Sequence, residues 1–169
     1  KEKLEEAREK IAKFVGCDSS ARKDVPPAQM ASANADRVGK IVFTSGGTES
    51  NNLALRGLAL ANPGKKHIVT SVLEHPSVLE VCEDLEKEGY DVDYVGVDSG
   101  GIVSVKEIEG KIRKDTLVVS VMHVNNEIGV VQPVEKIGKV CREKGVYFHS
   151  DAVQGFTKVD LSLKDVDLM

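Results

Sequence analysis

Short apolar runs alternate with amphipathic stretches along most of the chain. The runs span three to five residues and are rich in Val and Ile, and the stretches between them place apolar residues every three or four positions. This alternation is typical of βαβ units, in which helices cover both faces of a mainly parallel sheet. The expected strands are 41–44, 67–71, 92–95, 117–121 and 146–148, and the expected helices are 49–61, 76–88, 105–113 and 134–144.

Residues that start and stop helices mark these boundaries. Proline is tolerated in the first turn of a helix, glycine is common just after the last turn, and a Ser-x-x-Glu pair can cap an N-terminus. The chain places such residues at the expected ends: Pro76, Pro133, Gly89, Gly145 and the pair Ser104 and Glu107. The helix boundaries are therefore predicted independently of the apolar pattern.

Two further segments precede the alternation. Residues 1–16 have apolar residues at helical spacing and Glu–Lys pairs four residues apart, which predicts an amphipathic helix. Residues 17–40 contain Ser, Asp, Asn and two adjacent prolines, which predicts a loop insertion. We expect a three-layer α/β sandwich whose βα core occupies 41–169. Because the chain opens inside a helical pattern and stops at a strand-like run, we expect a truncated domain.

Composition narrows the class of protein. The chain has 169 residues, a net charge of −4, no Trp and no basic cluster, which argues against nucleic acid as a partner. No apolar run has membrane-spanning length. The three cysteines are widely separated and the four histidines lack zinc-ligand spacing, so we expect neither a disulfide framework nor a metal site. This pattern favours a protein of a reducing compartment such as the cytoplasm.

The first expected strand runs into a glycine turn followed by a helix. In the sequence Gly46-Gly47-Thr48, the glycines permit a sharp turn and Thr48 can cap the helix. The start of a helix offers unpaired N–H groups to a phosphate. The turn is neither a P-loop nor a G-x-G-x-x-G motif. It is either a phosphate site or an ordinary tight turn.

Polar side chains follow three later strands as well. His75 precedes a helix and is either a capping residue or a catalytic one; Asn126 belongs to an Asn pair that shapes a turn or binds a ligand. Asp151 and Gln154 follow the last strand, where Asp151 either caps a turn or faces a ligand. Because the carboxyl ends of parallel strands share one edge, we expect these residues to converge with Gly47 and Thr48 on one crevice.

A phosphate site, an imidazole, an amide and a carboxylate together suit a phosphorylated aromatic cofactor that contains a ring nitrogen. A carboxylate held against such a nitrogen keeps it protonated, as pyridoxal 5'-phosphate (PLP) requires to act as an electron sink. The predicted cofactor is therefore PLP.

Four motifs, in the same order, resemble those of the cysteine desulfurases, which are PLP enzymes of the class V aminotransferase group with the aspartate aminotransferase type of fold (fold type I). The first is Thr44-Ser-Gly-Gly-Thr-Glu-Ser-Asn-Asn52, and the second is Glu74-His75. The third is Met122-His-Val-Asn-Asn-Glu-Ile-Gly129, and the fourth is His149-Ser-Asp-Ala-Val-Gln154. The resemblance covers nearly everything from Lys40 to Met169, and the expected N-terminal helix fits it too.

The resemblance implies a role for each matching residue. Gly47 and Thr48 would hold the cofactor phosphate, and His75 would stack on the ring and assist proton transfer. Asn126 would contact the ring oxygen region or the substrate, Asp151 the pyridinium nitrogen and Gln154 the ring hydroxyl oxygen. The implied reaction takes sulfur from L-cysteine and leaves L-alanine and an enzyme persulfide for iron–sulfur cluster assembly or another sulfur-transfer pathway. A homodimer and a sulfur-acceptor or scaffold protein are the implied partners.

Two parts of the implied site are not found in the sequence. The family's Schiff-base lysine lies in a Ser-x-His-Lys motif, and its nucleophilic cysteine lies on a later loop; no lysine here has that context. Cys82 and Cys141 occupy apolar positions of expected helices and are interpreted as core residues, whereas Cys17 lies in the insertion. We therefore expect the isolated chain to be inactive. Selenocysteine lyase, a non-catalytic scaffold that retains the fold and a simple nucleotide-binding domain are the alternatives.

Overall fold

The computed structural model describes residues 2–15, 41–159 and 166–169. These residues form two compact units, one containing 2–15 and 41–43 and the other containing 44–159 and 166–169. The insertion expected at 17–40, including Cys17, lies outside the described residues.

The first unit contains helix α1 (Glu2–Phe14), as the sequence predicts. The side chain of Arg8 donates from Nε to the carbonyl of Ile41 at 2.9 Å, and its guanidinium lies 5.1 Å from the centre of the Phe43 ring. The strand predicted at 41–44 is wrong, since this segment has no regular secondary structure. A strand needs a hydrogen-bonded neighbour, and none of the described residues pairs with it.

The second unit is built on a parallel four-stranded sheet. Its strands are β1 (His67–Ser71), β2 (Asp91–Val95), β3 (Thr116–Ser120) and β4 (Tyr147–His149), in the order β2-β1-β3-β4. Each lies within one residue of its predicted position. All four carboxyl ends therefore meet at one edge of the sheet, as the sequence predicts.

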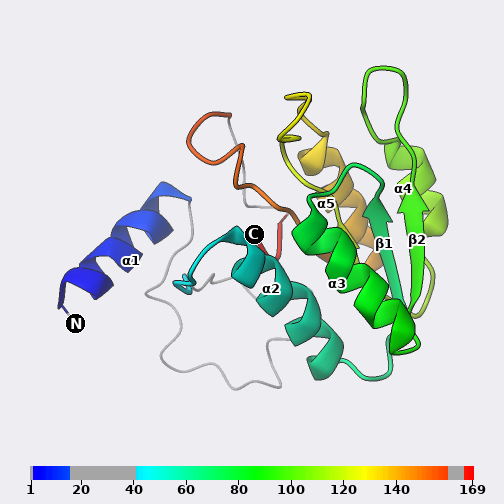
Figure 1. Cartoon of the computed structure of the whole chain (residues 1–169), viewed down its shortest axis with the longest axis horizontal. Helices are drawn as coiled ribbons and strands as arrows, with labels where there is room; N and C mark the ends of the chain where they lie inside the picture. The colour runs from blue at the N-terminus through cyan, green and yellow to red at the C-terminus, as the bar shows by residue number, and fades with distance from the viewer. Residues whose placement is uncertain (1, 16–40, 160–165) are drawn as a thin grey trace. The chain divides into compact units, whose positions relative to one another are not determined.

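Helices cover both faces of this sheet. Helices α2 (Gly47–Ala61) and α3 (Pro76–Lys87) lie on one face, and α4 (Val105–Lys111) and α5 (Val134–Lys144) lie on the other (Figure 1). The chain moves from β1 to β2 through α3 and then back across the sheet through α4 and α5. Right-handed crossovers in opposite directions place their helices on opposite faces. The predicted three-layer α/β sandwich is confirmed.

Most predicted helix signals act as expected. Pro76 lies in the first turn of α3, the Ser104 hydroxyl accepts from the N–H of Glu107 at 3.2 Å, and Gly145 ends α5 in the left-handed conformation with φ 67°. Some details differ from the prediction: α4 ends at Lys111 rather than at residue 113, and α3 ends at Lys87 rather than at residue 88. Pro133 is the N-cap residue of α5 rather than part of its first turn, and α2 begins two residues earlier than expected, at Gly47.

The main core lies between the sheet and the pair α2 and α3. Leu55, Ile68 and Val118 are fully buried there, together with Cys82. Cys141 is fully buried on α5. Burial raises the pKa of each thiol to about 12, because the thiolate loses its hydration. The interpretation of both cysteines as small core residues is confirmed.

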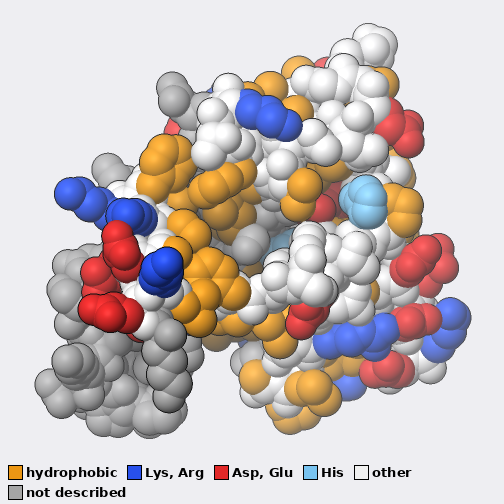
Figure 2. Space-filling view, turned by 60° about the vertical axis from the view of Figure 1, so that its left-hand side comes forward, with side chains coloured by type: hydrophobic (Ala, Val, Ile, Leu, Met, Phe, Trp, Pro, Cys, Tyr) orange, Lys and Arg blue, Asp and Glu red, His pale blue; other side chains and the backbone are white. Residues whose placement is uncertain are grey.

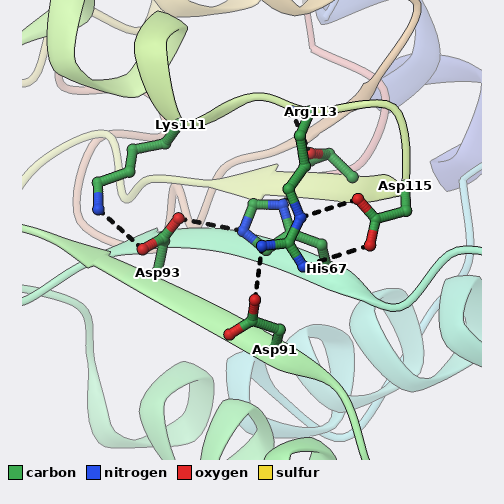
Figure 3. A network of polar contacts seen from close by, with 7 residues as sticks. His67, Asp91, Asp93, Lys111, Arg113 and Asp115 are labelled. Carbon is green, nitrogen blue, oxygen red and sulfur yellow. Dashed lines mark hydrogen bonds and ion pairs between the residues drawn. The ribbon is translucent and has the colours of Figure 1, made fainter.

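Charged residues form a network at the amino ends of the strands (Figure 3). The buried imidazole of His67 contacts the hydroxyl of Thr116 at 2.8 Å through Nδ1 and the carboxylate of Asp93 at 3.2 Å through Nε2. Lys111 holds the other oxygen of Asp93 at 2.8 Å, which lowers the pKa of that carboxyl. Burial lowers the pKa of His67. This network lies at the opposite end of the strands from the predicted site.

Replacing Asp93 with Ala is expected to destabilise the protein by about 1–3 kcal/mol, because Nε2 of buried His67 would lose its partner. The matched control is Asp91→Ala on the same strand. Asp91 contacts only the exposed Arg113 among the described side chains, so its loss should change stability by less than about 0.5 kcal/mol. Urea unfolding at neutral pH measures both. Equal effects would show that the imidazole does not depend on Asp93.

Positively and negatively charged side chains lie next to one another on the surface. On the face drawn in Figure 2, Lys and Arg side chains lie beside Asp and Glu side chains. Arg56, for example, pairs with Asp84 at 2.7 Å and with Glu88 at 3.4 Å, while Lys87 also pairs with Asp84 at 2.9 Å. Within the described residues, no helix has both the length and the apolar character needed to cross a membrane.

Candidate functional site

The amino end of α2 forms one side of the candidate site. Gly46 is its N-cap residue and provides no side-chain cap, so the predicted capping role of Thr48 is wrong. Because the helix already begins at Gly47, Thr48 lies inside the first turn, where its exposed side chain comes too late to cap. Glu49 instead accepts hydrogen bonds from the N–H and hydroxyl of Ser45, both at 2.6 Å, and these lower the pKa of Glu49. The first N–H groups of the helix remain available to an anion.

Gly47 approaches the loop that follows β4. A Cβ atom at Gly47 would lie 2.7 Å from Cγ2 of Val153, which is closer than two carbon atoms can pack. A side chain at this position would therefore push the two segments apart. The absence of a Cβ lets the start of α2 lie directly beside the segment that carries Asp151.

Asp151 is a buried carboxylate at the carboxyl end of β4, with 7% of its surface exposed. Its Oδ1 accepts from the N–H of Val153 at 3.0 Å, which is the turn-forming role considered above. Its Oδ2 accepts from the side-chain amide of Asn51 on α2 at 2.8 Å. Among the described residues, no Lys, Arg or His side chain pairs with it. A buried carboxylate without a countercharge is suited to a cationic ligand.

His75 is the N-cap residue of α3 and lies at the end of the short loop that follows β1. Its Nδ1 accepts from the N–H of Ser77 at 3.1 Å and lies 2.8 Å from the Ser77 hydroxyl. Nδ1 of His75 therefore caps the helix, which is one of the two roles that the sequence allows for this residue. Capping occupies only one ring nitrogen, so the same imidazole can also contact a ligand.

The two adjacent asparagines after β3 differ in environment. Asn125 is buried and shapes the turn: its Oδ1 accepts from the N–H groups of Glu127 and Ile128 at 2.9 and 3.0 Å, and its Nδ2 donates to the carbonyl of Leu73 at 3.0 Å. Asn126 is exposed. The turn-forming role therefore belongs to Asn125, and Asn126 remains the candidate for contact with a ligand.

Only some of the predicted site residues are linked to one another by hydrogen bonds or close packing. Hydrogen bonds connect His75 to Asp151 through Ser77 and Asn51, and close packing brings Gly47 beside the Asp151 loop. Gln154 is half-buried on that loop, and its side-chain oxygen accepts from Lys158 at 3.3 Å. Thr48, Asn126 and Gln154 lie on the same edge without such a bridge among the described contacts.

Several buried polar residues of this edge were missed by the sequence reasoning. Glu74 accepts from the Ser71 hydroxyl at 2.5 Å and from the N–H of Met122 at 2.9 Å through a single oxygen, and burial raises its pKa to about 8. Burial lowers the pKa of His149 to about 4. Glu74 follows β1 and His149 ends β4, so ionisable residues at the ends of apolar runs were the signal that could have identified them.

His123 lies against the same loop. Its Nδ1 is buried and has no hydrogen-bond partner among the described atoms, and burial lowers the pKa of the imidazole. A Cβ atom at Gly155 would lie 2.2 Å from that nitrogen. Glycine at this position therefore lets the loop after β4 close over the His123 ring, and the backbone N–H of His123 donates to the carbonyl of Asp151 at 2.8 Å.

The arrangement fits PLP in the features that the structure displays. The open amino end of α2 suits a phosphate, and the unpaired buried charge of Asp151 suits a protonated ring nitrogen. An anion site and a carboxylate on the carboxyl edge of a parallel sheet are typical of cofactor-binding sites in α/β proteins.

The chain belongs to the class-V aminotransferase family, whose pattern its sequence matches over residues 1–169. It is 44% identical to the cysteine desulfurase IscS of Rickettsia massiliae over 166 residues, which cover 98% of this chain and 36% of that protein. The chain thus spans little more than a third of the length of this curated relative.

Solved structures show the same relationship. A NifS-like protein superposes with a TM-score of 0.79 at 37% identity, covering 98% of this chain and 41% of its own. A structure described as SspA in complex with cysteine gives 0.72 at 39% identity, covering 89% of this chain and 48% of its own. The resemblance to the class V group and the predicted fold are confirmed.

Proposed function

We propose that the protein carrying this chain is a PLP-dependent cysteine desulfurase. The observation that carries the proposal is the buried carboxylate of Asp151, which no described cation neutralises and which lies beside the open amino end of α2. Family membership and relatives named cysteine desulfurase support this choice of activity. A similar structure described as a complex with cysteine supports L-cysteine as the substrate.

Six residues of this chain would hold the cofactor. The phosphate would bind the first turn of α2, where the helix dipole favours negative charge. Asp151 would face the ring nitrogen, His75 would lie on the ring face, and Asn126 and Gln154 would reach the ring oxygen and the substrate. The residues proposed to bind PLP are Gly47, Thr48, His75, Asn126, Asp151 and Gln154.

When bound, PLP supplies an electron sink for cleavage of the carbon–sulfur bond of cysteine. The role of Asp151 is to keep a proton on the ring nitrogen, because its carboxylate favours the cationic form. Nδ1 of His75 already accepts from the backbone of Ser77, so the opposite ring nitrogen, Nε2, is the one available for proton transfer. The buried thiols of Cys82 and Cys141 are unsuited to accept sulfur, because burial keeps them protonated.

The proposal also covers the products, the sulfur acceptor, the cellular location and the oligomeric state of the enzyme. The products would be L-alanine and a persulfide, with the sulfur passed to an acceptor or scaffold protein for iron–sulfur cluster assembly or another sulfur-transfer pathway. We place the enzyme in the cytoplasm as a homodimer. Buried, unpaired cysteines at 82 and 141 are consistent with a reducing compartment.

The decisive experiment supplies PLP, L-cysteine and a reducing thiol to the protein that carries this chain. We expect alanine and sulfide in equal amounts. Selenide released in large excess over sulfide, with L-selenocysteine as the competing substrate, would favour selenocysteine lyase instead. The isolated 169-residue chain should bind PLP and release no alanine. Adenine nucleotide binding without PLP binding would contradict the proposal.

A further inference from the structure

The side-chain amide of Asn51 connects two residues that the proposed function places around the cofactor ring. Asn51 lies in the first half of α2 and only 3% of its surface is exposed. Its nitrogen donates to Oδ2 of Asp151 at 2.8 Å and to the hydroxyl of Ser77 at 2.9 Å. One amide nitrogen has two hydrogens, so both are used.

The donor and the acceptor of each hydrogen bond between Asp151, Asn51, Ser77 and His75 follow from which atoms carry a proton. A carboxylate only accepts, so the nitrogen of the Asn51 amide must face Asp151. Ser77 then accepts from the same nitrogen and keeps its own proton to donate. The 2.8 Å contact from the Ser77 hydroxyl leads to Nδ1 of His75, which also accepts from the N–H of Ser77. Nδ1 therefore carries no proton, and Nε2 is the protonated nitrogen of the neutral ring.

We infer that Asn51 is a positioning residue, which fixes the Asp151 carboxylate directly and orients the His75 imidazole through Ser77. The inference rests on the proposed function, because it assigns Asp151 to the ring nitrogen and His75 to the ring face. The two residues follow β4 and β1, which are separated in the sheet by β3. Asn51 joins them from the same helix whose first turn would bind the phosphate.

A purely structural role for Asn51 makes a different prediction from a positioning role. Loosened packing would weaken every cofactor analogue alike. A misplaced Asp151 carboxylate would weaken only compounds that carry the ring nitrogen. The useful probe is therefore a pair of compounds, PLP itself and its carbocyclic analogue, in which C–H replaces the ring nitrogen.

The experiment measures the affinities of both compounds for the protein that carries this chain and for two variants. Wild type should prefer PLP, and Asn51→Ala should reduce that preference by roughly tenfold to a hundredfold, as expected for a lost hydrogen bond to a charged group. The matched control is Asn52→Ala on the same helix, whose amide donates only to the carbonyl of Thr48 among the described contacts. It should leave the preference unchanged.

The outcomes separate the inference from the proposed function. If wild type binds the two compounds equally, the proposed role of Asp151 is wrong and the inference falls with it. If wild type prefers PLP and Asn51→Ala keeps the full preference, only the inference is wrong.

A second measurement requires no variant at position 51. Nitrogen-15 NMR of histidine-labelled protein without cofactor, assigned with a His75→Asn variant, should show an acceptor nitrogen at Nδ1 and an N–H at Nε2. A proton on Nδ1 would show that His75 does not accept from Ser77, and would contradict the inferred orientation of His75 by Asn51.

Discussion

Replacing Asp151 with Asn is expected to weaken PLP binding by a factor on the order of 30 to 5,000. Removing one member of a buried charge pair costs about 2–5 kcal/mol, because the partner charge is left without compensation. The substitution removes the charge and replaces the oxygen that accepts from Asn51 with an NH2 group, so this hydrogen bond is lost as well. The Asn side-chain oxygen can still accept from the N–H of Val153, so the turn after β4 should keep its shape.

Titration of the protein with PLP, followed by equilibrium dialysis, measures the loss. Asp98→Asn is the matched control, because Oδ1 of Asp98 also accepts backbone N–H groups of its own loop, those of Gly100 and Ile102. Asp98 is exposed, and its variant should bind PLP as wild type does. Asp151→Ala removes the turn contact as well and should bind no better than Asp151→Asn. Equal PLP affinity in wild type and Asp151→Asn would show that Asp151 has only its turn-forming role.

The sheet was predictable because its signals are local. Residues 67–71 are a β-branched run between a turn and a proline, and they form β1 as expected. The segment 41–44 has the same composition and forms no strand among the described residues. The difference is a pairing partner, which no described residue provides for 41–44 and which the apolar run itself does not reveal.

The candidate site was predictable only as a set of positions. Polar residues after parallel strands share an edge wherever the strands pair, so His75 and Asp151 could be grouped from the sequence. The bond between Asn51 and Asp151 spans 100 residues and depends on how α2 is rotated about its axis. Nothing in the pair Asn51-Asn52 distinguishes the buried residue from its half-buried neighbour. The roles of Asn51 and Ser77 therefore required the structure.

Glu74 is the site residue whose ionisation should most affect stability. Burial raises its pKa from 4.5 to about 8, and the nearby charge of Asp151 raises it further against the lowering effects of Ser71 and Met122. At neutral pH the Glu74 side chain of the folded protein is therefore mainly the neutral carboxylic acid. Because the folded state binds this proton more tightly than the unfolded state, the stabilisation is complete below about pH 4.5 and is lost as the pH rises toward 8.

Ionisation of buried His149 changes the stability with pH in the opposite direction to ionisation of Glu74. Burial lowers its pKa from 6.5 to about 4, so its contribution is present above about pH 6.5 and is lost as the pH falls toward 4. His67 and His123, whose pKa values burial also lowers, act in the same direction as His149. Between about pH 6.5 and 8 most of the histidine contributions are in place, so the loss of the Glu74 contribution, about 2 kcal/mol, should dominate the pH dependence of wild type.

Glu74→Gln should remove this pH dependence, because the amide has the size of the protonated acid and cannot ionise. Urea unfolding at several pH values between 6.5 and 8 should show falling stability for wild type and a nearly constant value for the variant. The two proteins should be about equally stable at the acidic end. Glu80→Gln on the exposed surface of α3 is the matched control and should follow the wild-type curve. Parallel curves for wild type and Glu74→Gln would mean that Glu74 is already ionised in the folded protein, and that the site holds two carboxylate charges rather than one.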